Sequence, residues 1–260
     1  MLKHDTEVGR FYEVGRGRNR PSVTTILGAV WPRGGLDAWR YRNLARDMLS
    51  NPVYWSTKFR DAEFVTVRIR DKMVSPLAER LMHGSDDSSA ADRGTRIHEL
   101  VEMLCKSGEI PGEVAQEERD TALAAYGALQ AAGIDIRRLE AGVCGIEPIP
   151  YAGTADIVCK LGDEWCIVDL KFGRRMSRSW AAQVAAYAQA SHFIQPDEEG
   201  ELVLVSKPIC SIGLVLHVVD GIPRWYKIDM DRGASLWSSA CEVWKGANSS
   251  SPVMREWKGE

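Results

Sequence analysis

Hydrophobic and polar positions alternate along two segments in the middle of the chain. Residues 151–160 (YAGTADIVCK) and 164–171 (EWCIVDLK) have the alternating pattern of β-strands. A Gly-Asp pair between them is typical of the two-residue turns that close tight hairpins. With this turn, the numbers of facing residues add up to 325, so Asp156 faces Asp169 across the predicted hairpin.

The two faces of this hairpin carry different side chains. One face carries small or apolar side chains suited to a core: Ala155, Ile157, Cys159, Leu161, Cys166, Val168 and Leu170. The other face carries Asp156, Asp169 and Lys171, and it also carries three apolar residues, Val158, Trp165 and Ile167. These apolar neighbours favour a partly covered cleft over open solvent. A slip of one residue would exchange the two faces, so the register is well specified.

The facing carboxylates restrict the chemistry of this hairpin. Like charges directly opposite one another repel, and two carboxylates are stable at that distance only if one is protonated or a cation lies between them. Lys171 projects from the same face, two residues beyond Asp169. The simplest interpretation is a metal site with an adjacent lysine. The alternative is a solvent-facing strand pair that carries acidic residues without a function.

The rest of the chain alternates between helical and strand patterns. Residues 1–30 are predicted to form an arm with short strands, and residues 35–50 and about 58–82 to be helical. Further helices are expected at about 95–106, 115–132, from Ser177 or Ser179 to about His192, and 231–246. Further strands are expected at about 137–148, 202–206, 210–219 and 223–229. The pattern predicts an α/β (α+β) fold with a mixed central sheet flanked by helices and a helical N-terminal half.

Composition narrows the class of protein. With 45% hydrophobic and 27% charged residues and a formal net charge of −3, the chain is an ordinary globular protein, and a polyanion would have to bind a local patch. The six cysteines show no CxxC pair and suggest buried thiols in a reducing compartment: Cys105, Cys144, Cys159, Cys166, Cys210 and Cys241. The first ten residues, MLKHDTEVGR, have no apolar stretch typical of a secretory leader, and no apolar run approaches the about 18 residues of a membrane span.

Two helical pairs could join the acidic residues. His98 and Glu102 are one helical turn apart on the flank of an apolar stripe, and Gln183 and Tyr187 have the same spacing on the helix after the hairpin. A histidine on such a flank is more often a structural residue, and Tyr187 taken alone is explained by helix packing. In the functional interpretation, both pairs point toward the acidic residues of the hairpin.

A basic segment follows the hairpin directly. FGRRMSR contains Arg174, Arg175 and Arg178. Basic loops are usually solvated. Three arginines that follow directly after a predicted metal-bearing strand are, however, good candidates for binding phosphates.

Four segments of the chain carry these candidate residues: RGTRIHELVE (93–102), GTADIV (153–158), IVDLKFG (167–173) and QVAAY (183–187). Together, and in this order, they resemble the motifs of the RecB-like branch of the PD-(D/E)XK nuclease superfamily. That branch also contains the CRISPR-associated spacer-trimming exonuclease and the mitochondrial genome maintenance exonuclease. The segment PSVTTILG near the N-terminus looks like a segment found in phage-encoded and mitochondrial members of the branch. A single one of these motifs would be weak, because D-x-K occurs by chance in many proteins.

The resemblance implies a role for each matching residue. It implies the metal ligands His98, Asp156, Asp169 and the backbone carbonyl of Leu170, with Glu102 acting through water or on a second ion. The catalytic residues would be Asp156, Asp169, Lys171, Gln183 and Tyr187. DNA would contact Arg96, Arg174, Arg175, Arg178, Ser22 and Thr24. One or two Mg²⁺ or Mn²⁺ ions suit such ligands, and no iron–sulfur cluster is expected, because only Cys210 and Cys241 lie beyond residue 166.

The resemblance further implies a restriction-endonuclease-like sheet and a metal-dependent DNA exonuclease. Residues 1–92 would form an arm and a helical region that grips DNA, and residues 93–260 the nuclease core, in one compact unit. The expected substrate is single-stranded or end-opened DNA in recombination, repair or replication, in the cytoplasm of a bacterial or phage-infected cell. A helicase or recombination protein is a further candidate partner, and no membrane is expected. The alternatives are a structure-specific endonuclease, a non-catalytic DNA-binding protein and a hydrolase of small phosphoesters.

Overall fold

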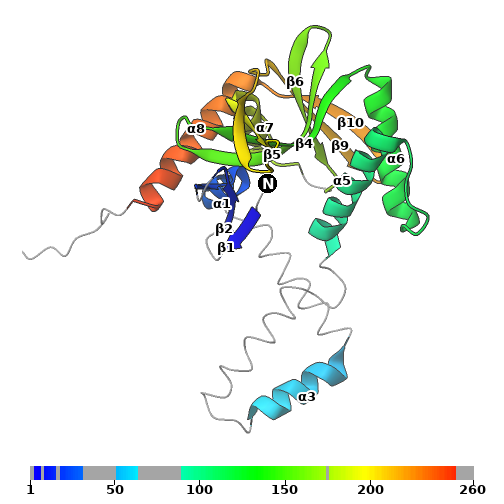
Figure 1. Ribbon diagram of the computed structural model, residues 1–260. Helices are drawn as coiled ribbons and strands as arrows, with labels where there is room; N and C mark the ends of the chain where they lie inside the picture. Colours follow the sequence, from blue (N-terminus) through cyan, green and yellow to red (C-terminus); the bar gives the residue numbers. More distant parts are fainter. Residues whose placement is uncertain are drawn as a thin grey trace, which may run out of the picture. The chain divides into compact units, whose positions relative to one another are not determined.

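The structure is a computed structural model, and it divides the chain into two units (Figure 1). It describes residues 3–6, 9–15, 18–31, 51–63, 89–173 and 176–249. One unit contains Met1–Trp31 together with Arg96–Glu260, and the other contains Pro32–Thr95. In this division the first 31 residues belong with the larger unit, whereas the sequence-based boundary at residue 92 groups them with the helical region. All candidate site residues that the structure describes lie in the larger unit.

A mixed sheet of seven strands forms the centre of the larger unit, in the order β10-β9-β6-β5-β4-β7-β8. The strands are β4 (Asp135–Gly145), β5 (Tyr151–Leu161), β6 (Glu164–Lys171), β7 (His192–Pro196), β8 (Leu202–Ser206), β9 (Ile212–Val219) and β10 (Ile222–Lys227). Neighbouring strands are antiparallel except β6 and β9, which are parallel. A parallel pair needs a long crossover, and the chain between β6 and β9 contains a helix and the hairpin of β7 and β8. The predicted mixed central sheet flanked by helices is confirmed.

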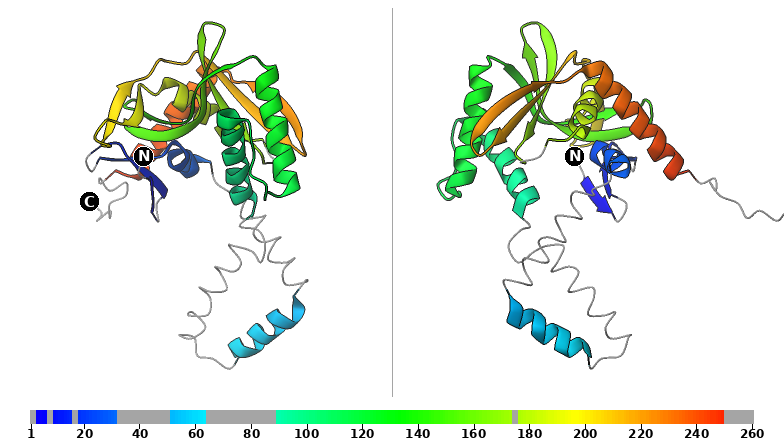
Figure 2. Two further views of the ribbon diagram at one scale, coloured as in Figure 1. Left: turned by 45° about the vertical axis from the view of Figure 1, so that its right-hand side comes forward. Right: turned by 180° about the vertical axis from the view of Figure 1, so that it is seen from behind.

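Helices cover both faces of this sheet (Figures 1 and 2). They are α1 (Val23–Val30), α5 (Ser89–Ser107), α6 (Gln116–Ala131), α7 (Ser179–Gln189) and α8 (Met230–Ala247). Helices α1, α7 and α8 share one buried cluster with the sheet, and α5 and α6 share another. Because both faces are covered, side chains on both faces of β5 and β6 are buried, including Val158 and Ile167 beside the acidic residues. This confirms a covered rather than a solvent-facing hairpin.

A small sheet at the N-terminus packs onto the large one. Its strands are β1 (Lys3–Thr6), β2 (Gly9–Glu13) and β3 (Asn19–Pro21), in that order. Tyr12 and Val14 are buried in a cluster with Cys144, Ala152 and Ile194 of the large sheet. The predicted arm therefore contains short strands as expected, but its last part, PSVTTILG, leads into helix α1, which was not predicted.

From residue 115 onward the element boundaries follow the sequence pattern closely, except at the end of helix α7. The pairing of β5 with β6 runs from Leu161 opposite Glu164 to Ile157 opposite Val168, in the predicted register. Helix α7 ends at Gln189 rather than near His192, which instead begins strand β7. The sequence hides this end, because apolar residues continue beyond it while the backbone becomes extended at the capping residue.

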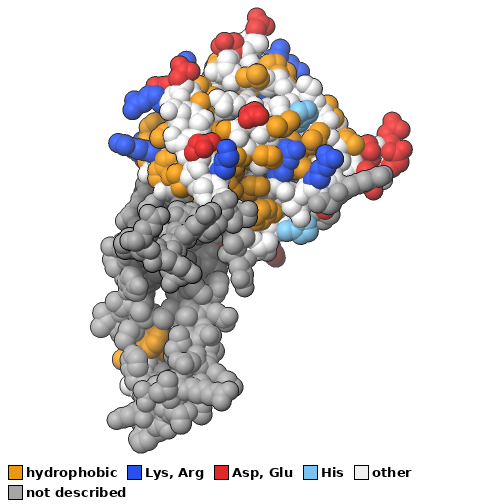
Figure 3. Space-filling model, turned by 90° about the vertical axis from the view of Figure 1, so that its left-hand side faces the viewer, with side chains coloured by type: hydrophobic (Ala, Val, Ile, Leu, Met, Phe, Trp, Pro, Cys, Tyr) orange, Lys and Arg blue, Asp and Glu red, His pale blue; other side chains and the backbone are white. Residues whose placement is uncertain are grey.

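The predicted N-terminal helices are only partly within the described residues. The expected helix at 35–50 lies outside them, and of the helix expected at about 58–82 only the first residues are described, as the end of α3 (Pro52–Glu63). None of the described helices has the length and apolarity to cross a membrane. On the face in Figure 3, the coloured Lys and Arg side chains are interspersed with acidic and hydrophobic ones and form no single continuous basic surface.

Candidate functional site

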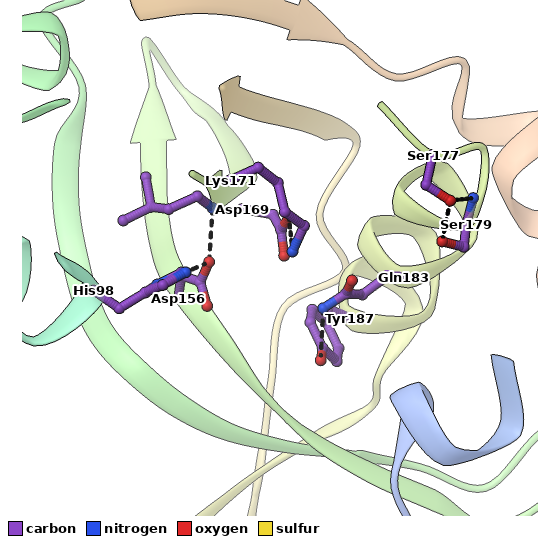
Figure 4. A network of polar contacts seen from close by, with 9 residues as sticks. His98, Asp156, Asp169, Lys171, Ser177, Ser179, Gln183 and Tyr187 are labelled. Atoms are coloured by element: carbon purple, nitrogen blue, oxygen red, sulfur yellow. Dashed lines mark hydrogen bonds and ion pairs between the residues drawn. The ribbon is translucent and has the colours of Figure 1, made fainter. Parts of the chain in front are cut away.

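The two aspartates of the hairpin lie just beyond the last paired residues of β5 and β6. The Oδ2 atom of Asp156 accepts a hydrogen bond from the backbone N–H of Leu170, 2.7 Å away. The carboxylate of Asp156 therefore accepts the backbone hydrogen bond of this residue of β6 (Figure 4). Asp169 is fully buried, and Asp156 is partly buried. The two carboxylates influence each other, since the charge of Asp156 helps to raise the pKa of Asp169, but they lie where the regular β5–β6 ladder has ended, and their direct opposition stays a prediction.

Asp169 lies against Lys171, whose Nζ atom is 2.7 Å from Oδ2 of Asp169. The other carboxylate oxygen, Oδ1, is buried and has no hydrogen-bond partner among the described residues. Burial raises the pKa of Asp169 to about 6, although the charge of Lys171 opposes this shift. Burial also acts to lower the pKa of Lys171, but Asp169 and Asp156 outweigh it and the pKa is raised. Lys171 is therefore a cation at neutral pH.

His98 reaches the acidic residues from helix α5. Its Nδ1 atom lies 3.6 Å from Oδ2 of Asp156, and the ring of Phe172 packs edge-on against it with 5.0 Å between centroids. Burial, followed by the charge of Lys171, lowers the pKa of His98 to about 4. The imidazole is thus neutral near pH 7, which is the form that binds metal ions. The position on the flank of the apolar stripe does let His98 reach Asp156.

Glu140 on β4 is a further member of the site that the sequence did not reveal. One ligand atom each from His98, Glu140 and Asp156 lie within 4.8 Å of one another, so these residues could hold a metal ion. Residues on either side of Glu140 pair with residues on either side of Asp156, which puts the two acids on neighbouring strands at the same level. Glu140 has a φ of 45°. Such values are uncommon outside glycine and cluster at functional sites.

The donor set fits a divalent cation. Two carboxylates with one neutral imidazole suit Mg²⁺ or Mn²⁺, which prefer oxygen ligands and tolerate a nitrogen. The buried Oδ1 atom of Asp169, which lacks a donor among the described groups, is a further oxygen at the site. Asp169 itself is outside the three-residue group and lies beside it, next to Lys171. A backbone hydrogen bond with Leu170 contributes to the pKa of His98, so the backbone of Leu170 also lies next to the imidazole.

Gln183 and Tyr187 approach the site from helix α7 (Figure 4). Gln183 Nε2 donates to the Tyr187 hydroxyl oxygen, 3.2 Å away. Tyr187 is only 4% exposed, and burial followed by the charge of Asp169 raises its pKa well above the usual value. A Cβ atom on Gly153 would lie 2.6 Å from the Tyr187 ring. Glycine at that position of β5 therefore lets the ring lie directly on the strand, where Tyr187 is part of the buried core.

Other predicted site residues have partners elsewhere. Glu102 accepts a hydrogen bond from Nζ of Lys106 at 2.5 Å and is not part of the three-residue group. Arg96 donates two hydrogen bonds to Glu118 of α6, at 2.9 and 2.6 Å. The metal role of Glu102 and the DNA contact of Arg96 therefore stay predictions, with these ion pairs as competing explanations.

The remaining DNA-binding candidates are spread over two helix ends. Ser22 is buried and caps α1 by accepting a hydrogen bond from the N–H of Thr25, whereas Thr24 is exposed. Arg178 is exposed at the N-cap position of α7, and it makes no side-chain cap there; Ser177 Oγ instead accepts the N–H of Ser179. Arg174 and Arg175 lie outside the described residues.

Comparison with known proteins adds little to this site. No protein-family model matches the chain, and no curated protein matches it. Among solved structures, one described as "Crystal structure of SSO0001" shares 13% sequence identity, with a TM-score of 0.31 over 72% of this chain and 73% of that chain. This likeness is distant. Function is therefore inferred below from the geometry of the site.

Proposed function

We propose that this chain is a metal-dependent nuclease that hydrolyses phosphodiester bonds of DNA. One observation supports this most: His98, Glu140 and Asp156 converge within 4.8 Å, and the Asp169–Lys171 pair lies beside them on the adjacent strand. Oxygens that could bind a metal ion, next to a partly buried ammonium, suit a reaction that creates negative charge on a phosphate. Membership of the PD-(D/E)XK superfamily, suggested by the four sequence motifs, is part of this proposal.

The proposed cation ligands are His98, Glu140 and Asp156, with Asp169 and the carbonyl of Leu170 completing the site. When bound, a divalent cation would polarise a phosphate oxygen and lower the pKa of a nearby water molecule. The lowered pKa of His98 keeps its nitrogen free of a second proton near neutral pH. Glu140 takes a place that the sequence analysis had not assigned.

Lys171 and the α7 pair would act on the substrate. The ammonium of Lys171 is fixed 2.7 Å from the Asp169 carboxylate and would offset charge that develops on the phosphate. Gln183 is held by its hydrogen bond to Tyr187 and would orient a phosphate or a water molecule. These residues come from β6 and α7, so the parallel crossover after the hairpin positions the second half of the site.

The preference for free ends of single-stranded or opened DNA comes from the resemblance to the RecB-like branch. Three arginines between β6 and α7 support a polymeric phosphate substrate over a small one. The DNA-gripping role of residues 1–92 and the involvement of a recombination or helicase partner belong to the same proposal.

A cleavage assay with end-labelled DNA tests this function. With Mg²⁺ or Mn²⁺, linear single-stranded DNA should be shortened progressively, circular single-stranded DNA should stay intact, and EDTA should stop the reaction. Asp169→Asn and Lys171→Met should abolish cleavage but leave DNA binding largely intact, whereas Asp163→Asn in the exposed hairpin turn should cleave normally.

Three outcomes would change the conclusion. Cleavage of the circle would indicate an endonuclease on the same fold. Full activity of the Asp169→Asn or Lys171→Met variant would exclude the assigned site. Binding without cleavage of any substrate by the wild-type protein would indicate a non-catalytic DNA-binding protein.

A further inference from the structure

His217 on β9 is a buried polar residue for which the proposed reaction has no role so far. It is 3% exposed, and its Nε2 atom donates a hydrogen bond to the carbonyl oxygen of Gly173, 2.5 Å away. Its Nδ1 atom is buried and has no hydrogen-bond partner among the described residues. Burying an imidazole with half of its polar atoms unsatisfied is unfavourable. Because this burial is costly, the hydrogen bond that His217 does make, to the carbonyl of Gly173, needs an explanation.

The contact lies where strand β6 ends. The parallel ladder between β6 and β9 finishes with Lys171 opposite His217. Gly173 is two residues further on, beyond the last residue of β6. Its carbonyl is held by the side chain of His217 instead of by a strand partner, so the restraint on the backbone continues past the sheet.

The three residues Lys171–Gly173 make three different contacts in succession. Lys171 pairs with Asp169 at 2.7 Å, the ring of Phe172 supports the His98 ring at 5.0 Å, and the carbonyl of Gly173 accepts from His217. One short segment thus connects the ammonium and the imidazole of the site to β9. A shift of this segment would move both groups.

The His217 ring is itself fixed from its other sides. Trp180 in the first turn of α7 packs against it with 5.0 Å between ring centroids, and Tyr226 of β10 lies at 6.3 Å. These contacts come from two further elements, α7 and β10, in addition to the strand β9 that carries His217. The donor therefore points at Gly173 from a rigid position, which is what a positioning group requires.

We propose that His217 is a positioning residue for the nuclease reaction proposed above, on which this inference rests. It touches neither the cation site nor the substrate. By holding Gly173 it keeps Lys171 beside Asp169 and keeps Phe172 against His98. Without this hydrogen bond, the site would bind a cation less tightly, and Lys171 would be less well placed.

A matched pair of variants tests the hydrogen bond. His217→Gln keeps an N–H donor at nearly the position of Nε2, and His217→Leu keeps similar volume without a donor. We expect His217→Leu to lower kcat and Mn²⁺ affinity by about tenfold each with little change in KM, and His217→Gln to stay within about threefold of the wild type. In the metal-free protein, hydrogen–deuterium exchange over residues 170–173 should speed up in the His217→Leu variant and not in the His217→Gln variant.

A second variant approaches the same segment from the cation side. Phe172→Leu removes the ring that supports His98 and should weaken Mn²⁺ binding in calorimetry while leaving the contact at Gly173 intact. If His217→Leu fails to fold, His217→Gln should still keep nearly the wild-type Mn²⁺ affinity and Phe172→Leu should lower it. A loss of affinity in His217→Gln, or an unchanged affinity in Phe172→Leu, overturns the proposal.

The proposal is overturned if folded His217→Leu keeps the wild-type kcat, Mn²⁺ affinity and exchange rates. It is also overturned if His217→Gln is as impaired as His217→Leu, because packing rather than the donor would then matter. If the wild-type protein cleaves no DNA, the proposed function fails separately, and the Mn²⁺ titrations and exchange rates still report whether His217 supports the site.

Discussion

Replacing Asp169 by asparagine should stabilise the metal-free protein while it removes the proposed activity. The pKa of Asp169 rises from 3.8 to about 6, with burial as its largest cause. Each pKa unit corresponds to about 1.36 kcal/mol, so the ionised carboxylate costs about 3 kcal/mol at pH 7. The side chain is only 1% exposed, so solvent screening reduces this cost little. Asparagine resembles the protonated form and does not carry that cost.

The sign of the pH dependence follows from the direction of the shift. The pKa of Asp169 is higher in the folded state than in the unfolded state. Below the unfolded pKa of 3.8, the neutral carboxyl group imposes no cost on folding; the protein then loses stability as the pH rises through the folded pKa of about 6. The difference between Asp169→Asn and the wild type should therefore be about 1 kcal/mol at pH 4.5, grow through pH 6 and reach about 3 kcal/mol above pH 7.

Urea denaturation followed by circular dichroism in EDTA at several pH values measures this difference, and thermal melts should show an increase of roughly 6–12 °C at pH 7.5. Asp163→Asn is the matched control, since it removes an exposed acid from the same hairpin. The reasoning is refuted if Asp169→Asn is no more stable than the wild type at pH 7.5, or if its advantage does not change between pH 4.5 and 7.5.

Two further predictions concern residues of strands β4 and β5. Glu140→Gln should weaken Mn²⁺ binding by at least about tenfold, because it removes one of three converging ligands; calorimetry checks this, and unchanged affinity would remove Glu140 from the site. Gly153→Ala should destabilise the fold by about 1–3 kcal/mol, because the new methyl group would lie 2.6 Å from the Tyr187 ring. The urea midpoint and the cleavage rate of Gly153→Ala should both fall. Gly127→Ala on α6 is the control: a Cβ atom added there would meet nothing within 4 Å, so the urea midpoint should not fall.

The hairpin could be predicted from the sequence because two independent features specify one register. The Gly162-Asp163 turn determines which residues face each other, and the alternation of side chains would fail in any neighbouring register. The observed pairing from Leu161 and Glu164 onward agrees. Helical spacing alone left His98 open between a structural role and a role at the site, and it was the resemblance of RGTRIHELVE to a nuclease motif that favoured the site.

Glu140 could not be found in the same way. The connection between β4 and β5 is not a two-residue turn, so the facing residue of Asp156 on β4 could not be counted from it. The positive φ of Glu140 depends on the surrounding structure and leaves no sign in the residue type. Strand β7 was missed for a related reason: the end of α7 depends on tertiary contacts such as Nζ of Lys207 donating to the Ala188 carbonyl.

The irregular features of the sheet are concentrated at the candidate site. Asp156 uses its carboxylate to accept the N–H of Leu170, Glu140 opposite it has a left-handed backbone, and Asp169 has a buried oxygen without a donor among the described residues. The hydrogen bond to Leu170 is favourable, but the left-handed backbone of Glu140, the desolvation of the two aspartates and the unsatisfied oxygen of Asp169 each raise the free energy of the metal-free protein. A bound cation would compensate the two desolvated carboxylates together, since both favour their charged form beside a positive charge. Cation binding and folding stability should therefore be coupled in this protein through the same few atoms, and the stability gained on losing Asp169 measures one part of that coupling directly.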